Sequence, residues 1–392
     1  MKLSSLRVKV TGTVLICLAA AAAAILMVLH VNFNHQADQM TRDAVAEAQQ
    51  LFRNLEAADV NKMSVVLEAL LANDAYQGAY TEAHRKQLYD RGKAFFERMR
   101  SDYHFTLWQF NNPESAGTVF LRMHRPEGFG DPLKRWMYEE CVRTKAPVAG
   151  KELGHSGFAL RVMMPQRDHQ GNILGYVEVG EEIGRFFSAM QVETGNQYGI
   201  ALKKVLLQKD KWADFRKSRG LLNNWDDMRD MVVGDRTTEN EQLMNVQADI
   251  DAISKEGQVL GRISSGGGTY VRGVFPVMAA DGQRTGAVFV VKDMTSAFAN
   301  LRGLELKVAG LIVAITLVIC ILVSAMLERW VFRRLDHMIE MATLVVGGDY
   351  ECVIPKSADD EVGQFEYLFD QFRKVFLSLA KKHQSQETTA RA

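Results

Sequence analysis

Two runs of apolar residues dominate the hydrophobicity pattern of the chain. One extends from Val10 to Val31 and the other from Val308 to Leu327. Each is about 20 residues long, the length of a helix that spans a bilayer. A cleavable signal peptide is the alternative for the first run, but its apolar core is too long and no small-residue cleavage site follows it. The pattern therefore predicts two transmembrane helices.

Basic residues precede the first run and follow the second. They are Lys2, Arg7, Lys9, Arg329, Arg333 and Arg334. Because Lys and Arg are enriched in cytoplasmic loops, both ends of the chain are predicted to be cytoplasmic. The segment between the runs should then lie outside.

This outer segment contains an internal repeat. The stretch ALRVMMPQRDHQGNILGYVEVG at 159–180 returns as YVRGVFPVMAADGQRTGAVFVV at 270–291. The matches, all at one offset of 111 residues, pair Arg161 with Arg272, Pro165 with Pro276, Gly171 with Gly282, Gly175 with Gly286, Val177 with Val288 and Val179 with Val290. Each copy reads as a β-hairpin, with a Gly-containing turn and a return strand of alternating valines. The repeat indicates two copies of one module, and a chance match is the alternative.

A long helix is predicted before the first module. From Asp38 to Leu70 the chain has neither Gly nor Pro, and its apolar residues recur at helical spacing with gaps. They are Met40, Ala44, Leu51, Leu55, Val66 and Leu70. Such a stalk helix is about 50 Å long, and its apolar stripe faces either the sheet or a second subunit. A further helix at 81–100 and a mixed sheet complete the first module, so the expected fold class is α+β.

The residues after the second apolar run predict two coiled-coil seams. Apolar residues there step by three and four: Leu335, Ile339, Ala342 and Val346 in the first seam, and Val362, Phe365, Phe369, Phe372 and Phe376 in the second. The connector GGDYECVIPKSADDEVG lies between them. An ordinary helical hairpin is the alternative to a bundle.

Composition excludes several classes of function. The chain has 47 basic and 47 acidic side chains, so it lacks the charge excess of a nucleic-acid-binding protein. Of its four cysteines only Cys141 lies in the outer segment, so no intrachain disulfide is expected there, and no zinc spacing occurs. GGDYE is similar to the GGDEF signature of diguanylate cyclases, but only one helix and a polar tail follow it. We expect no enzyme activity and no cofactor or metal.

The hairpin pattern R-x-x-x-P, a Gly turn and G-x-V-x-V resembles the Cache (extracellular, PAS-like) sensor fold. Its duplication between two membrane spans resembles double Cache receptors, over roughly residues 35–305. The stretch from TVFLRMHRPEGFGD to the first hairpin is similar to the membrane-distal module of bacterial sensor histidine kinases and chemoreceptors. More loosely, it is similar to Cache domains that sense citrate and C4-dicarboxylates. This resemblance implies two PAS-like modules.

The two seams with GGDY and DDEVG resemble a HAMP domain, a parallel four-helix bundle built from two chains. Gly348, Pro355 and Glu361 occupy pattern positions of its connector. HAMP first helices usually begin with a proline, whereas Arg333 and Arg334 stand there in this chain. Coupling to the second span is therefore expected to differ.

The expected organisation begins with a cytoplasmic N-terminus (1–9) and a transmembrane helix (10–31). A double sensor region (32–306) follows, which consists of a stalk helix (38–70), a membrane-distal module (75–185) and a membrane-proximal module (195–295). A second transmembrane helix (308–327), a HAMP domain (328–380) and a polar tail (381–392) come after it.

Candidate ligand-binding residues lie in the first module. A small organic anion needs cationic donors, and Arg forks grip carboxylates with two hydrogen bonds. Arg122, His124 and Arg161 meet this need, since Arg122 and His124 share a face of an extended run. In the dicarboxylate sensors matching positions hold Arg, His and a second Arg, but with the spacing Arg-x-x-His, where this chain has Arg-x-His. Structural Arg–carboxylate pairs are the alternative, because Arg272 occupies the equivalent place in the second module.

Three further residues, Tyr103, Trp108 and Met163, are candidates for the pocket lining, although such residues are more often part of a core.

These features predict a two-pass receptor of the bacterial inner membrane, with its sensor region in the periplasm or extracellular space. It would bind a small organic ligand outside and signal, as in two-component systems or chemotaxis, through a homodimeric HAMP bundle to a separate cytoplasmic protein. No contact with nucleic acid is expected, and lipid surrounds the spans. The alternatives are a ligand-free membrane adaptor, or the input half of a truncated sensor kinase, chemoreceptor or diguanylate cyclase.

Overall fold

The structure is a computed structural model that describes residues 6–391 except 77–81, 114–116, 155–157, 241–242, 244–248 and 355–357. The chain divides into two compact units. One is Gln36–Ala299, and the other combines Met1–His35 with Asn300–Ala392. Each is considered by itself.

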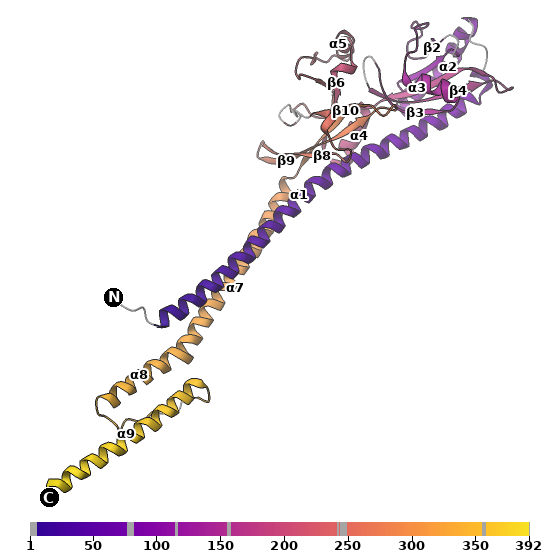
Figure 1. Cartoon of the computed structure of the whole chain (residues 1–392). Coiled ribbons are helices and arrows are strands. Elements are labelled where there is room, and N and C mark those ends of the chain that lie inside the picture. Colours follow the sequence, from indigo (N-terminus) through magenta and orange to yellow (C-terminus); the bar gives the residue numbers. More distant parts are fainter. Residues whose placement is uncertain are drawn as a thin grey trace. The chain divides into compact units, whose positions relative to one another are not determined.

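Two antiparallel five-stranded sheets form the framework of the unit Gln36–Ala299 (Figure 1). The first has the strand order β2-β1-β5-β4-β3 and the second β7-β6-β10-β9-β8. The strands are β1 (Leu107–Asn111), β2 (Val119–Arg122), β3 (Val148–Leu153), β4 (Phe158–Arg167), β5 (Ile173–Glu182), β6 (Gln197–Lys203), β7 (Met231–Arg236), β8 (Gln258–Ser265), β9 (Gly268–Met278) and β10 (Arg284–Asp293).

The strand order confirms the α+β class and the predicted duplication. Strands β4 and β5 are the first repeat and β9 and β10 the second, and each pair has the same place in its sheet. We name the structures around the two sheets module one and module two. The expectation of a mixed sheet was wrong, because the strands that the structure describes in module one pair antiparallel.

This unit contains α2 (Glu82–Tyr103), α3 (Trp136–Thr144), α4 (Gly184–Thr194) and α5 (Lys209–Ser218), with short 3₁₀ turns at Asp74–Tyr76, Lys204–Leu206 and Ile250–Ala252. It also contains the part of α1 (Leu6–Leu71) from Gln36 onward. Helix α1 contains both the first apolar run and the predicted stalk without interruption. Thr81, the expected start of the second helix, lies outside the described residues.

One hydrophobic core joins α1 to both sheets. Phe52 of α1 is 3% exposed, and its ring lies 5.8 Å from that of Phe186 in α4 and 5.7 Å from that of Phe275 in β9. Met63 and Leu67, further along α1, are fully buried in the same cluster. Of the predicted stripe, Leu70 is buried in this cluster and Leu51, Leu55 and Val66 pack against it, so the stripe contacts the sheets of its own chain.

Module two also contacts an outer strand of module one. The backbone N–H of Ala280, in the β9–β10 turn, donates to the carbonyl of Lys151 in β3 over 2.8 Å. Gly150 stands beside this contact with φ +151°, and a Cβ at this position would approach the Ala280 Cβ to 2.8 Å. Glycine is therefore required where the turn meets the strand.

The unit that includes Asn300–Ala392 is helical. It contains most of α7 (Thr295–Leu327), a π-helical turn (Glu328–Phe332), α8 (Arg333–Val346) and α9 (Glu361–Arg391). Helices α1 and α7 each include a stretch long and apolar enough to cross a membrane, and protein does not bury these stretches. They are candidate spans.

Polar contacts join the two apolar helices near both ends of their hydrophobic runs. Arg7 pairs with Glu328, and the His30 Nδ1 lies 2.8 Å from the Glu305 Oε1. Arg7 precedes the first run, and Glu328 follows the second. Their contact agrees with the prediction that both flanks lie on one side of a membrane.

We expect Phe52→Ala to lower the free energy of unfolding by about 3–5 kcal/mol, because it leaves a cavity where α1, α4 and β9 meet. Denaturant unfolding of the detergent-solubilised protein measures this loss. Val65→Ala, at a position of α1 that is 65% exposed, is the control and should change stability by less than about 0.5 kcal/mol. Equal effects of the two substitutions would contradict the shared core.

Candidate functional site

The predicted ligand residues come together on one face of the first sheet. In the register of the strands, Gln109 of β1 lies opposite both Arg122 of β2 and Glu178 of β5, and Glu178 lies opposite Met163 of β4. Residues directly opposite one another point to the same side of a sheet. Arg161, two residues before Met163 on β4, shares this face as well.

A buried carboxylate lies at the centre of this face. The Glu178 side chain is fully buried, and its Oε1 accepts a hydrogen bond of 2.6 Å from the Arg161 Nη1. Arg135, the residue before α3, donates to both carboxylate oxygens, over 2.7 and 3.2 Å. Burial raises the pKa of Glu178, but the two guanidiniums outweigh it and hold the pKa at about 2. Glu178 is therefore ionised at neutral pH.

Arg135 extends the network to β3. Its Nη1 lies 3.1 Å from the Glu152 Oε2, and the other Glu152 oxygen accepts the backbone N–H of Met137 over 3.1 Å. That N–H belongs to the first turn of α3, which needs an acceptor from outside the helix. Arg135 was absent from the sequence prediction. It lies in a polar run, 43 residues before its partner Glu178, and no local pattern indicates the pair.

Arg122 is held by the loop that follows β2. Its guanidinium makes two parallel hydrogen bonds of 2.7 Å to the carboxylate of Asp131, a geometry that favours carboxylates. It also donates to the Gly128 carbonyl over 2.8 Å and to the Gln109 Oε1 over 3.1 Å. The side chain of Asp131 is 51% exposed. Arg122 thus uses four of its five N–H donors within the chain, one pair of them on a carboxylate that solvent reaches.

His124 lies beside these arginines as a neutral group. The residue is exposed to solvent as a whole, but partial desolvation lowers the pKa of the ring, and the charges of Arg122 and Arg161 lower it further, to about 4. Glu178 and a hydrogen bond with the Trp108 backbone act in the opposite direction. The structure therefore corrects the expectation of a cationic His124. The positive charges of this face come from Arg122, Arg135 and Arg161.

The three expected lining residues lie in different places. Met163 is on the face of Glu178, in a buried cluster with Tyr138, Cys141 and Tyr176. Trp108 points to the other face, where its ring packs within 5.4 Å of Tyr76, because it alternates with Gln109 along β1. Tyr103 ends α2 and is 49% exposed. The side chains of Trp108 and Tyr103 therefore do not line the face that holds the arginine cluster.

A cavity of about 220 Å³ opens beside the outer part of the network. Arg135 and Glu152 line it from module one, and Asp281 and Gln283 line it from the β9–β10 turn. This volume has room for several waters or a small organic ion.

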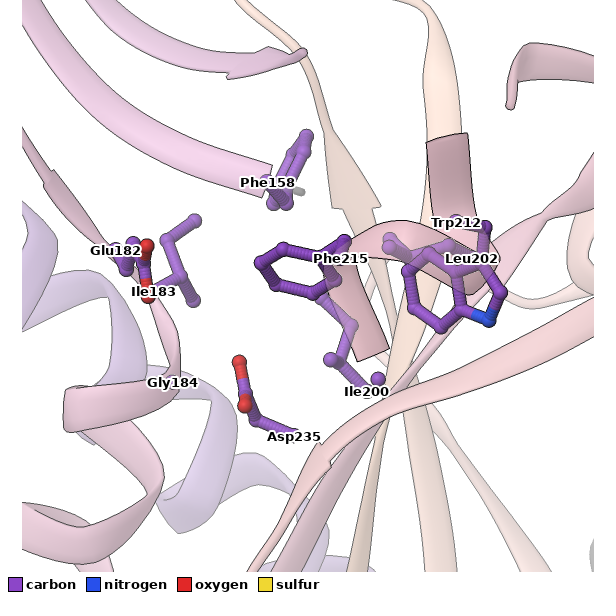
Figure 2. Close-up of a pocket in the computed structure, with 10 residues that line it drawn as sticks. Phe158, Glu182, Ile183, Gly184, Ile200, Leu202, Trp212, Phe215 and Asp235 are labelled. Carbon is purple, nitrogen blue, oxygen red and sulfur yellow. The ribbon is translucent and has the colours of Figure 1, made fainter. Parts of the chain in front are cut away.

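A second cavity, shown in Figure 2, lies where α4 follows β5 and meets module two. Phe158, Ile183 and Phe215 are among its apolar lining residues, and Asp235 lies at its edge. Its volume is about 20 Å³, which holds one water at most. This cavity is a small gap where side chains of the two modules pack against each other.

The predicted seam residues of the second unit lie on α8 and α9. Ile339, Val346, Phe365, Phe372 and Phe376 are exposed, and Leu335, Ala342, Val362 and Phe369 are partly exposed. Gly348 follows α8 with φ +95°, and Glu361 begins α9. Pro355 lies outside the described residues.

Polar contacts within one chain use other residues of these helices, whereas Phe376 of the seam stacks on Tyr350 with ring centroids 6.4 Å apart. Arg334 of α8 pairs with Asp360 over 2.6 Å and with Glu366 of α9 over 3.2 Å. Arg373 donates to Tyr350 in the connector. The apolar stripe is therefore left without a full covering in the single chain.

Residues 42–227 match a family model, dCache_3, described as the double sensory domain of two-component sensor kinase. The match includes all of module one and ends before β7 of module two. No curated protein matches the chain.

Solved structures of low identity resemble the chain weakly. The ligand-binding domain of the Campylobacter jejuni chemoreceptor Tlp3, in complex with L-valine, is 10% identical over 67% of this chain and 95% of its own, with a TM-score of 0.39. The periplasmic domain of Vibrio cholerae LuxQ is 10% identical over 65% of this chain and 99% of its own, with a TM-score of 0.36. At these TM-scores the likenesses say nothing about the ligand of this chain.

We expect Glu178→Gln to destabilise the protein by about 3–5 kcal/mol at pH 7, because it leaves the buried Arg161 guanidinium without its counter-charge and Arg135 with Glu152 alone. The folded-state pKa of Glu178 is depressed below 4.5, so its contribution is present above pH 4.5 and is lost as pH falls towards 2. The loss of stability on acidification should therefore be smaller in Glu178→Gln than in the wild type. Thermal unfolding from pH 7 to 3 measures both effects.

Glu127→Gln is the control, since the side chain of Glu127 is 71% exposed. It should reproduce the wild-type stability and pH profile. If Glu178→Gln did the same, the buried charge network would not carry the stability that its geometry indicates.

Proposed function

We propose, from the premise that this chain carries a double Cache sensory domain, that it is a membrane-bound receptor for a small ligand outside the cytoplasm. The match over residues 42–227 and the two sheets of equal strand order support the sensory role. No catalytic step is part of the proposal. The proposal keeps the domain boundaries that the sequence predicts.

The proposed location is the inner membrane of a bacterium, crossed twice. Its support is the position of the two candidate spans, which flank the sensory region. The basic residues beyond them favour the cytoplasm for both flanks. The sensory region then lies in the periplasm.

The proposed ligand is a small organic carboxylate. The observation that carries this proposal is the gathering of Arg122, His124 and Arg161 on the face of Glu178. His124, neutral at pH 7, would act as a hydrogen-bond partner of the ligand, and Arg161 would contribute positive potential. Within the cluster Arg122 is the cation whose carboxylate partner is solvent-exposed.

We infer that the ligand carboxylate replaces Asp131 at Arg122. Asp131 already shows that the fork accepts a carboxylate in a bidentate geometry. It is half exposed, whereas Glu178 is fully buried between two arginines. Exchange at Arg122 therefore leaves no buried charge unpaired, while exchange at Arg161 would. The loop from Gly128 to Asp131 would move when the ligand binds.

Two substitutions with opposite effects test this exchange. Arg122→Ala should weaken binding by about 2–5 kcal/mol, because the ligand charge loses its partner. Asp131→Asn should tighten binding by about 10–100-fold, because the competing charged hydrogen bonds of about 1.5–3 kcal/mol disappear. Calorimetric titration of the full-length protein with citrate and C4-dicarboxylates gives both affinities.

Arg272→Ala is the matched control. It alters the equivalent arginine of module two and should leave the affinity within about twofold of the wild type, about 0.4 kcal/mol. Equal losses for Arg122→Ala and Arg272→Ala, or weaker binding by Asp131→Asn, would contradict the proposed site.

For the relay we propose a HAMP-like bundle formed by α8 and α9 of two chains. The exposed seam residues support this, since an apolar stripe on a helix pair needs a covering surface. Ligand binding would shift the dimer between two arrangements, and the bundle would pass the change to a separate cytoplasmic protein.

Phe369→Asp places a charge in this seam and should abolish dimers, because a buried unpaired charge costs several kcal/mol, about 3–5 in protein interiors. Light scattering of the protein in detergent gives the mass. Tyr367→Asp, on the same helix but outside the seam, is the control and should remain dimeric. A monomeric wild type, or dimers of Phe369→Asp, would refute the bundle.

A ligand-free membrane adaptor is the second candidate. One observation favours it: the charges of Arg122 and Arg161 already have carboxylate partners in the chain. If none of the carboxylates changes the melting temperature of the wild type or of Asp131→Asn, the adaptor becomes the better account.

A further inference from the structure

We propose that Asp59 and Glu181 form a proton-binding site that couples external acidity to the docking of α1 on module one. Asp59 lies on α1 and Glu181 at the end of β5. Their side chains are 13% and 1% exposed, and both contact the Lys62 ammonium. Two carboxylates buried this close together repel each other when both are ionised, which favours a proton on one of them.

Two cations complete the site. The Nζ of Lys62, one turn along α1, lies 2.7 Å from the Asp59 Oδ1 and 3.5 Å from the Glu181 Oε2. The guanidinium of Arg185, in α4, contacts Asp59 and lies 3.3 Å from the Glu181 Oε2. The Lys62 ammonium also donates to the carbonyl of Tyr103, at the end of α2, over 3.3 Å. The site therefore joins three helices and a strand.

Neighbouring charges belong to other pairs. Glu56, the acidic residue before Asp59 on α1, pairs with Lys151 of β3. Glu182, next to Glu181 on β5, points to the other side of the strand and pairs with Arg219. Hence the charged groups that face Glu181 are Asp59, Lys62 and Arg185, as its electrostatic surroundings also indicate.

The proton belongs chiefly to Glu181. Burial raises the pKa of Glu181 above its usual 4.5, and the hydrogen bond and charge of Asp59 raise it further, against the opposing effect of Lys62 and Arg185. For Asp59, burial also raises the pKa, but the hydrogen bond with Glu181 and the two cations outweigh it and lower the pKa. Glu181 is thus the donor and ionised Asp59 the acceptor.

The direction of the pH effect follows from this assignment. A carboxyl whose pKa is higher in the folded than in the unfolded state stabilises the fold below the unfolded value. That stability is lost as pH rises from 4.5 through the raised folded pKa. Loss of the proton leaves two carboxylates in contact within a buried site, so it weakens the attachment of α1 to β5.

Protons would thus be a second input, separate from the organic ligand. Glu181 and Glu178 lie on opposite faces of β5, because they are three residues apart in a strand. Asp59 is on α1, the helix that also contains the first candidate span. Acidity would therefore act on the stalk directly, without the arginine cluster. The inference goes beyond the proposed ligand and does not depend on it.

Thermal unfolding of full-length protein in detergent, followed by Trp fluorescence from pH 5 to 9, tests the site. One linked proton should lower the wild-type Tm by about 2–4 °C per pH unit from pH 5 up to the raised pKa of Glu181, and the slope should level off above that pKa. Glu181→Gln keeps a donor to Asp59 but does not titrate, so it should lose this slope. Glu182→Gln, whose carboxylate is 45% exposed, should keep it. Identical slopes for the wild type and Glu181→Gln would overturn the proposal.

Infrared spectroscopy gives an independent measurement on the wild type, whether or not Glu181→Gln folds. A protonated carboxyl band should persist at pH 6, where exposed carboxyls are ionised, and should be missing from Glu181→Gln but present in Glu182→Gln. Its absence from the wild type would overturn the shared proton. Carboxylate titrations at one fixed pH remain a separate test of the Arg122 site, so the two proposals can fail separately.

Discussion

Burial of the α1 stripe against two sheets is the constraint on which the sensory region depends. Each sheet has an inner face of large apolar residues, and Phe52 of α1 touches side chains of both modules and of α4. A sheet with one uncovered apolar face is not stable in water. Since the same helix covers both sheets, neither module can shift on α1 without disturbing a core that it shares with the other. Module one thereby gains a mechanical connection to the stalk.

The outer face of the first sheet combines a network of charges with a small apolar cluster around Met163. Strand alternation places Val177 and Val179 in the core and Glu178 between them on the other side. A carboxylate without water must have cations close by, and two arginines from distant parts of the chain supply them. In the same network Arg122 is the cation whose carboxylate partner, Asp131, is exposed to solvent. The buried pairs of Glu178 and the exposed pair of Arg122 thus belong to different members of one network.

The sequence was informative where a pattern repeats and silent where distant residues meet. The offset between Arg161 and Arg272 predicted the duplicated strand order, because two similar hairpins need similar places in two sheets. It did not indicate that Arg135 would reach Glu178, since that contact depends on where α3 begins. The side of the sheet taken by Trp108 was equally hidden, because a shift by one residue exchanges the faces of a strand. Charge states such as that of His124 depend on all neighbours together.

The contact of Ala280 with Lys151 has a consequence for how such receptors can be recombined. β3 is an edge strand, and an uncovered edge offers unpaired backbone groups to any other extended chain. The turn of module two occupies part of this edge, and Gly150 leaves the space for it. A chimera that contains module one alone would expose the part of the β3 edge that the turn of module two covers. The two modules should therefore be transferred together in a chimera. Their junction should be kept intact, as the spans are.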